Sequence, residues 1–176
     1  MHTQLILTLL GSDRTGLVES LAEAIAERQG NWIESRMCRL GGQFAGVLRA
    51  DIPAGQEVEL LKDIERLRSS GLSVQYTFEP HRGETAPSLY YQLEVLGRDR
   101  PGIVASLFKE LAGKSINVEE LTTGCKTAPW SGEVLFESAA RLSVPASTDM
   151  AALTASLDKL ADDLMIEIKL ERVQHL

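Results

Sequence analysis

The chain carries LTLLGSDRTGLVESLAEAIAERQGNWIESRM at residues 7–37 and LEVLGRDRPGIVASLFKELAGKSINVEELTT at residues 93–123. The two stretches align without a gap, so that residue 7 meets residue 93. The shared residues include Gly11, Asp13, Arg14, Gly16, Val18, Ser20, Leu21, Ala26 and Asn31, which meet Gly97, Asp99, Arg100, Gly102, Val104, Ser106, Leu107, Ala112 and Asn117. Solenoid repeats are about 20 to 50 residues long. Because this repeat is longer, each copy is expected to be a complete small domain.

The two copies are separated by a polar stretch at residues 81–87, HRGETAP, which contains Gly and Pro. This composition is typical of a linker. The sequence therefore predicts a first domain at residues 1–82, a linker at 83–87 and a second domain at 88–176.

Hydrophobic periodicity predicts the same order of elements in both copies. Residues 3–10 form an apolar run typical of a buried strand, and from Leu17 the apolar residues recur at helical spacing until Gly30. Strands are predicted at 31–40 and 43–52, joined by a turn at Gly41-Gly42, and a helix at about 58–67 precedes a strand at 72–78. The corresponding second-copy ranges are 88–96, 101–113, 116–126, 133–144, 148–162 and 164–173.

The predicted fold class is α+β. Two crossover connections per copy give a ferredoxin-like βαββαβ sandwich, in which a four-stranded antiparallel sheet carries both helices on one face. Trp32, Ile33, Met37 and Phe44 supply more apolar strand side chains than one helix layer is expected to cover. We therefore expect sheets to pack face to face or edge to edge, between the copies or between chains.

Composition narrows the possible functions. The chain has 18 Lys and Arg against 25 Asp and Glu, a net charge of −7, and no basic cluster. Direct binding to nucleic acid is therefore disfavoured. There is no basic N-terminal signal region and no apolar run of about 20 residues, so we expect a cytoplasmic protein that does not span a membrane.

The sharpest feature is the junction between the first strand and the first helix of each copy, LGSDRTGLV at 10–18 and LGRDRPGIV at 96–104. Pro101 suits the first position of a helix, because its missing N–H costs nothing there. Gly16 and Gly102 have no Cβ to obstruct the free N–H groups of the first helical turn. An anion such as the carboxylate of a free amino acid is predicted to bind there.

The ammonium group of such a ligand needs an oxygen partner. Asp13, Asp99, Asn31 and Asn117 are the candidates, which together with the junction predict a pocket for a zwitterion. An alternative stays open for each: an Asp before a helix often caps it, and an Asn after a helix often occupies a turn.

These junctions resemble the ACT domain, in which Gly-x-Asp-Arg-[Thr/Pro]-Gly-[Leu/Ile]-Val leads into an amphipathic helix and an Asn follows about fifteen residues later. The resemblance implies a module that binds amino acids at domain interfaces through this loop and regulates enzymes or transcription. Thr15 departs from the commoner Pro seen at Pro101, so binding is expected to be asymmetric. The implied ligand-binding residues are Ser12, Asp13, Arg14, Thr15, Gly16, Leu17 and Asn31 in the first copy and Arg98, Asp99, Arg100, Pro101, Gly102, Ile103 and Asn117 in the second.

Two such domains without an attached catalytic or DNA-binding domain are similar to the glycine cleavage system transcriptional repressor family. This likeness implies a regulator that contacts a DNA-binding protein, with glycine as the first candidate ligand and a homodimer as the expected state. The alternative partner is an enzyme of amino-acid metabolism, for which the chain would be a regulatory subunit. A purely structural dimerisation module also remains open.

Enzyme functions find little support in the residues. There is no P-loop and no dinucleotide-binding glycine motif. His2, His81 and His175 have no spacing that indicates a metal site or a triad, and we expect no catalytic residue and no cofactor. Cys38 and Cys125 are predicted to be reduced thiols packed in the core or sheet. An acylphosphatase-like hydrolase shares the fold, but these junctions lack the glycines and basic residues of a phosphate cradle.

Overall fold

The chain divides into two compact units, Met1–Glu84 and Thr85–Leu176. The structure is a computed structural model that describes residues 2–69, 71–79, 88–129 and 131–174. The expected linker at 83–87 and the residues His81 and His175 lie outside the described residues.

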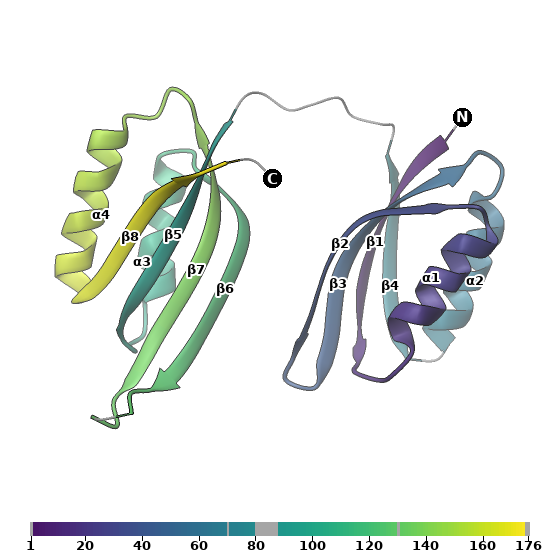
Figure 1. The fold of residues 1–176 in the computed structure, drawn as a ribbon, viewed down its shortest axis with the longest axis horizontal. Coiled ribbons are helices and arrows are strands. Elements are labelled where there is room, and N and C mark those ends of the chain that lie inside the picture. Colours follow the sequence, from purple (N-terminus) through teal and green to yellow (C-terminus); the bar gives the residue numbers. More distant parts are fainter. Residues whose placement is uncertain (1, 70, 80–87, 130, 175–176) are drawn as a thin grey trace. The chain divides into compact units, whose positions relative to one another are not determined.

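The first unit is a four-stranded antiparallel sheet with two helices on one face (Figure 1). Its elements are β1 (His2–Ser12), α1 (Leu17–Glu27), β2 (Asn31–Leu40), β3 (Gln43–Pro53), α2 (Glu57–Ser69) and β4 (Leu72–Glu79). The strand order is β2-β3-β1-β4, so that the two central strands are the first and third along the chain.

The second unit repeats this architecture. Its elements are β5 (Ser88–Arg98), α3 (Ile103–Gly113), β6 (Asn117–Thr127), β7 (Val134–Pro145), α4 (Met150–Leu164) and β8 (Ile166–Val173). The strand order is β6-β7-β5-β8, which matches the first unit position by position. The predicted α+β class with two βαββαβ sandwiches is confirmed.

Each unit has a hydrophobic core of its own between sheet and helices. In β1 the buried residues alternate as Leu5, Leu7 and Leu9, because successive side chains of a strand point to opposite faces. Leu21 and Ile25 of α1 cover them from one side of the helix. The second core repeats this arrangement around residues such as Leu93, Leu107 and Leu111.

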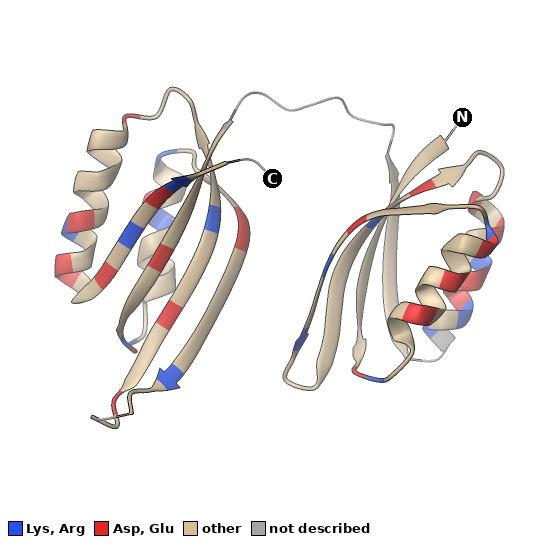
Figure 2. Cartoon of the chain, viewed as in Figure 1, with Lys and Arg blue, Asp and Glu red and all other residues tan. Residues whose placement is uncertain are grey.

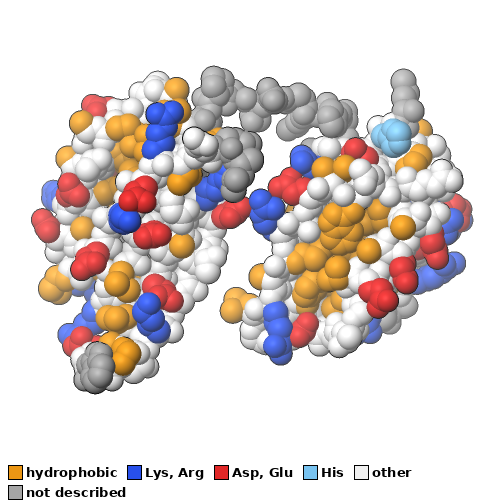
Figure 3. All heavy atoms as spheres, viewed as in Figure 1, with side chains coloured by type: hydrophobic (Ala, Val, Ile, Leu, Met, Phe, Trp, Pro, Cys, Tyr) orange, Lys and Arg blue, Asp and Glu red, His pale blue; other side chains and the backbone are white. Residues whose placement is uncertain are grey.

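Three of the four apolar strand residues that were expected to remain uncovered by the helices are covered. Trp32, Met37 and Phe44 pack against the first unit's own core, and of the four only Ile33 is largely exposed, at 41%. The exposed apolar side chains include Leu10 and Val47, next to buried Leu9 and Leu48 on β1 and β3. Because they alternate with core residues, they lie on the face that the helices leave uncovered. Figure 3 shows apolar side chains gathered in a patch on the first unit.

The two cysteines are exposed, which corrects the prediction of packed thiols. Cys38 lies on β2 and Cys125 on β6, and each of these strands is an edge strand with a single neighbour in its sheet. Such a strand is less completely covered by a helix layer than the central strands are.

Charged residues lie on helices and strands of both units. Figure 2 shows them dense on α1 and α2 of the first unit, and it shows both signs of charge on strands such as β2 and β8. Among the described residues no helix is both long and apolar enough to cross a membrane.

Candidate functional site

The two junctions between strand and helix place a glycine with a positive φ directly before each helix. Gly16 has φ 88° and Gly102 has φ 97°, and each is the N-cap residue, so that α1 begins at Leu17 and α3 at Ile103. Only glycine adopts this left-handed conformation without strain. A Cβ built on Gly102 would meet nothing within 4 Å, so the space beside the helix start is open.

The start of α3 corrects the role predicted for Pro101. The sequence predicted a helix from residue 101, with Pro101 at its first position, but the helix begins two residues later. Pro101 is an exposed residue of the turn that precedes Gly102. The backbone needs a left-handed residue to turn from β5 into α3, and this requirement fixes the start of the helix at the glycine.

No side chain caps the first turn of α1 or α3. In contrast, the side chain of Asp149 caps α4, because its Oδ1 accepts hydrogen bonds from the N–H groups of Ala151 and Ala152 at 3.0 and 3.1 Å. The capping role that remained open for Asp13 and Asp99 is therefore excluded. The repeated junctions leave N–H donors at the positive end of a helix dipole without a protein side chain to accept from them.

Asp13 is held between two elements of the first unit. Its N–H donates to the carbonyl oxygen of Gly42 at 3.0 Å, and its Oδ2 lies 2.6 Å from Nε of Arg39, near the end of β2. The carboxylate that the sequence offered to a ligand ammonium thus already pairs with a guanidinium.

Asp99 occupies the equivalent place in the second unit, and its N–H donates to the carbonyl oxygen of Val134 at 2.9 Å. Cys125 on β6, which pairs in register with Phe136, lies close enough to Asp99 for its thiol to interact with the carboxylate. Desolvation and the negative charge and hydrogen bonding of Asp99 raise the pKa of the Cys125 thiol, with a further contribution from the charge of Glu137. The neighbour of Asp99 is therefore a neutral thiol at neutral pH.

The remaining junction residues are of three kinds: arginines with a polar partner, buried residues of the core, and exposed residues. Arg98 forms an ion pair with Glu133, and Nη2 of Arg100 donates to the carbonyl oxygen of Asp163 in the last turn of α4 at 3.0 Å. Leu17 and Ile103 are buried in the two cores, so their side chains anchor the helix starts and only their backbone faces the junction. Ser12, Arg14 and Thr15 are exposed.

The structure does not bring Asn31 and Asn117 to the junctions. Asn31 is the first residue of β2 and lies opposite Asp51, which pairs with Gln4 near the start of β1. Since β1 rises about 3.4 Å per residue, Asn31 is about 27 Å along the sheet from Ser12. Asn117 lies correspondingly opposite Ser143, and its Nδ2 donates to Oε1 of Glu119 at 2.8 Å. Within one unit a small ligand cannot contact both the Asp and the Asn.

The left-handed residues after α1 and α3 are Gln29, with φ 55°, and Ser115, with φ 58°. The turn role considered for the two Asn residues therefore belongs to other positions.

A cavity of about 540 Å³ lies elsewhere, on the sheet of the second unit. Its lining includes Glu94, Leu96, Lys126, Glu137 and Lys169 and none of the predicted ligand-binding residues. The small residues Thr122, Gly124 and Ala139 also line it and explain why the sheet is hollowed there. We favour the junctions as the functional site because they carry unpaired directional donors, whereas Lys126 and Lys169 in the cavity already pair with Glu137 and Glu171.

Sequence reasoning missed Arg39 and Cys125. The repeat itself carried the signal, because residue 39 aligns with residue 125 when residue 7 is aligned with residue 93. The hairpins then bring the ends of β2 and β6 beside the junctions, at Asp13 and Asp99.

Comparison with known families agrees with this architecture. A model of the ACT domain family matches residues 3–78. This match spans nearly the whole of the first unit, which is therefore similar to ACT domains. The second unit has the same strand order and the same junction, and the two form a tandem ACT-like arrangement.

Two solved structures are similar to this chain over nearly its whole length. An unknown protein from Galdieria sulphuraria has a TM-score of 0.88 and 27% identity, with 99% of this chain and 100% of that chain covered. A provisionally assigned glycine cleavage system transcriptional repressor has a TM-score of 0.72 and 16% identity, with 99% of both chains covered. At this identity the second likeness shows the fold alone. No curated protein matched the chain.

Proposed function

We propose that the chain is a non-catalytic regulatory protein that senses a free amino acid at its junctions. The observation that supports this proposal is that the helices after Gly16 and Gly102 have no side-chain cap. In contrast, α4 of the same chain is capped by Asp149. Backbone N–H groups and the helix dipole favour a carboxylate there, the dipole by about 0.3 to 1 kcal/mol at an exposed site.

We propose further that the output is transcriptional. Two ACT-type domains make up the described chain, and its full-length structural likeness to a provisionally assigned glycine cleavage repressor supports this direction. Because the net charge is −7, contact with a DNA-binding regulator is favoured over contact with DNA. Glycine is then the first candidate ligand and a homodimer the expected state.

A thermal-shift screen of the twenty protein amino acids tests the sensing function. A ligand present at 100 times its dissociation constant stabilises the folded state by about 2.7 kcal/mol, which raises the melting temperature measurably. Unchanged melting curves for all twenty would refute amino-acid sensing and would favour a structural dimerisation module.

A pull-down from the source cell tests the output. Capture of a DNA-binding regulator supports the transcriptional role. Capture of a metabolic enzyme instead would show that the chain acts as an enzyme's regulatory subunit.

A further inference from the structure

The residue beside the junction aspartate differs between the two units: it is Arg39 beside Asp13 and Cys125 beside Asp99. Arg39 and Cys125 are equivalent in both chain and sheet, because each pairs in register with a phenylalanine of the next strand, Phe44 or Phe136. We propose that only the second junction binds the ammonium group of an α-amino acid, through Asp99, and that Arg39 blocks this role at Asp13. This inference rests on the proposed function and assigns its site to one unit.

In the first unit the charge of Asp13 is already neutralised. Nε of Arg39 lies 2.6 Å from Oδ2 of Asp13, a charge-assisted hydrogen bond. A ligand ammonium would have to displace a guanidinium that is tethered to the adjacent strand and is therefore present at a high local concentration. The first junction keeps its uncapped helix start, but the carboxylate of Asp13 is already compensated there, and the other carboxylate near Gly16, that of Glu19, belongs to the helix itself.

In the second unit the equivalent partner is a thiol, which is a weak donor and carries no positive charge. The raised pKa of Cys125 keeps this thiol protonated at neutral pH. In the part of the chain that the structure describes Asp99 forms no ion pair, so an ammonium group that approaches it has no cation to displace and gains the stronger, charge-assisted bonds.

The cations nearest to Asp99 along the chain are engaged elsewhere. Arg98 pairs with Glu133, and Arg100 donates to the carbonyl oxygen of Asp163. Lys126, the neighbour of Cys125, pairs with Glu137. The carboxylate of Asp99 thus lies three residues before the uncapped helix start at Gly102 and is not paired with any of these cations. The second junction presents both halves of a zwitterion site, an anion for the ammonium and N–H donors for the carboxylate.

Calorimetric titration of the full chain with each of the twenty protein amino acids tests the proposal through stoichiometry. We expect one ligand per chain for the wild type. Cys125→Arg should rebuild the ion pair of the first unit and weaken binding at least tenfold, and Asp99→Asn should do the same without adding bulk. Arg39→Cys should release Asp13 and raise the stoichiometry to two.

Cys38→Arg is the matched control, since it places the same side chain on an exposed strand position next to Arg39 in sequence but on the opposite face of the sheet. Its affinity and stoichiometry should equal those of the wild type. Two ligands per wild-type chain, or unchanged affinity in both Cys125→Arg and Asp99→Asn, would overturn the assignment to Asp99 while leaving the sensing function intact. Absence of binding by every amino acid would overturn both.

Discussion

The glycines before α1 and α3 have two separate roles, one in the backbone and one in access to the helix start. Gly102 has φ 97° and open space around its Cβ position, so a small side chain there meets no neighbour but must adopt a strained backbone. We expect Gly102→Ala to destabilise the chain by about 1 kcal/mol, the cost of a left-handed conformation for a residue with a Cβ. Urea unfolding at equilibrium measures this change.

Gly113→Ala is the control for that substitution. Gly113 closes the same helix, also has open space at its Cβ position, and has no positive φ. Because alanine loses less backbone entropy than glycine in a helix, this variant should be as stable as the wild type or slightly more stable. Equal losses in both variants would show that the conformation of Gly102 is not the cause.

The geometry of the candidate site could be predicted from sequence only where neighbouring residues define it. The repeat identified Gly16, Gly102 and the aspartates before them, because the turn from strand to helix depends on neighbouring residues. The partner of each aspartate depends on strand register, which a linear pattern does not contain, and this is why Arg39 and Cys125 were missed. Strand register also explains why Asn31 does not reach the junction. It follows the helix closely in sequence, yet it starts a strand at the far end of the sheet.

At the scale of elements, α2 begins with a carboxylate that stabilises its own helix start. Oε2 of Glu57 accepts from the N–H of Gly55 at 2.6 Å, and Oε1 accepts from the hydroxyl of Thr3 at 3.1 Å. Hydrogen bonds from its own N–H, from Gly55 and from Thr3 lower the pKa of Glu57, although desolvation opposes them. The folded-state pKa is below the unfolded value of about 4.3. The ionised Glu57 side chain therefore stabilises the folded state fully above about pH 4.3, and this stabilisation is lost as the pH falls through the folded-state pKa.

We therefore expect Glu57→Gln to be less stable than the wild type at neutral pH and to match it in acid. The measurement is the midpoint of urea unfolding for both proteins from pH 7 downward. Glu23→Gln removes an exposed carboxyl group from the middle of α1 and is the control. A difference between Glu57→Gln and wild type that stayed constant with pH would contradict the role of the ionised carboxylate.

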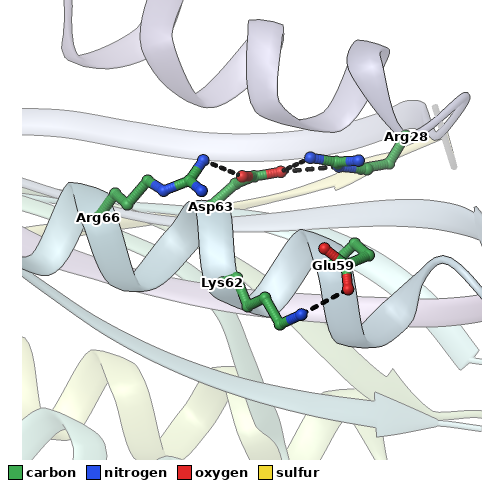
Figure 4. Close-up of polar contacts among 5 residues, drawn as sticks. All are labelled: Arg28, Glu59, Lys62, Asp63 and Arg66. Atoms are coloured by element: carbon green, nitrogen blue, oxygen red, sulfur yellow. Dashed lines mark hydrogen bonds and ion pairs between the residues drawn. The ribbon is translucent and has the colours of Figure 1, made fainter.

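Helices α1 and α2 are joined by a buried carboxylate between two guanidinium groups (Figure 4). Oδ2 of Asp63 lies 2.7 Å from both Nε and Nη2 of Arg28 at the end of α1, and Oδ1 lies 2.7 Å from Nη1 of Arg66. The hydrogen bond with Asp63 raises the pKa of Arg28. Since the Asp63 side chain is only 8% exposed, Asp63→Asn should cost about 2 kcal/mol of unfolding free energy.

Glu59→Gln is the control, because Glu59 pairs with Lys62 at 2.6 Å on the same helix but in solvent. Both residues are largely exposed, so this variant should lose clearly less stability than Asp63→Asn in the same urea titration. If Glu59→Gln lost as much unfolding free energy as Asp63→Asn, burial would not be the reason for the contribution of Asp63 to stability.

The elements themselves were predicted closely because their apolar residues follow regular periods. β3 alternates buried Leu48, Ala50 and Ile52 with less buried neighbours, and its ends are marked by Gly42 and Pro53. The cysteines were predicted wrongly because a strand pattern does not reveal whether the strand lies in the middle or at the edge of its sheet. Edge position follows from the order of all four strands, β2-β3-β1-β4, which is a property of the whole unit.

At the scale of the whole molecule, the two cores are built from separate sets of residues. The buried cluster of the first unit runs from Leu5 to Val74, and that of the second runs from Leu93 to Ile166. Leu21 and Leu107 hold equivalent places in these clusters, and each is 1% exposed. Replacement of either by alanine removes buried methyl groups and leaves a cavity, so we expect each variant to lose about 3 kcal/mol in its own unit.

Hydrogen–deuterium exchange resolved by peptide distinguishes the two units in the intact chain. Leu107→Ala should accelerate exchange in the strands β5 to β8 and leave β1 to β4 unchanged, and Leu21→Ala should do the reverse, because opening of one core exposes only its own backbone hydrogen bonds. The two variants are each other's control, since they delete the same atoms at equivalent positions. Faster exchange in both units from a single substitution would mean that the units unfold as one cooperative body, and the stabilities of the two ACT-type domains could then not be tuned independently by a ligand bound to one of them.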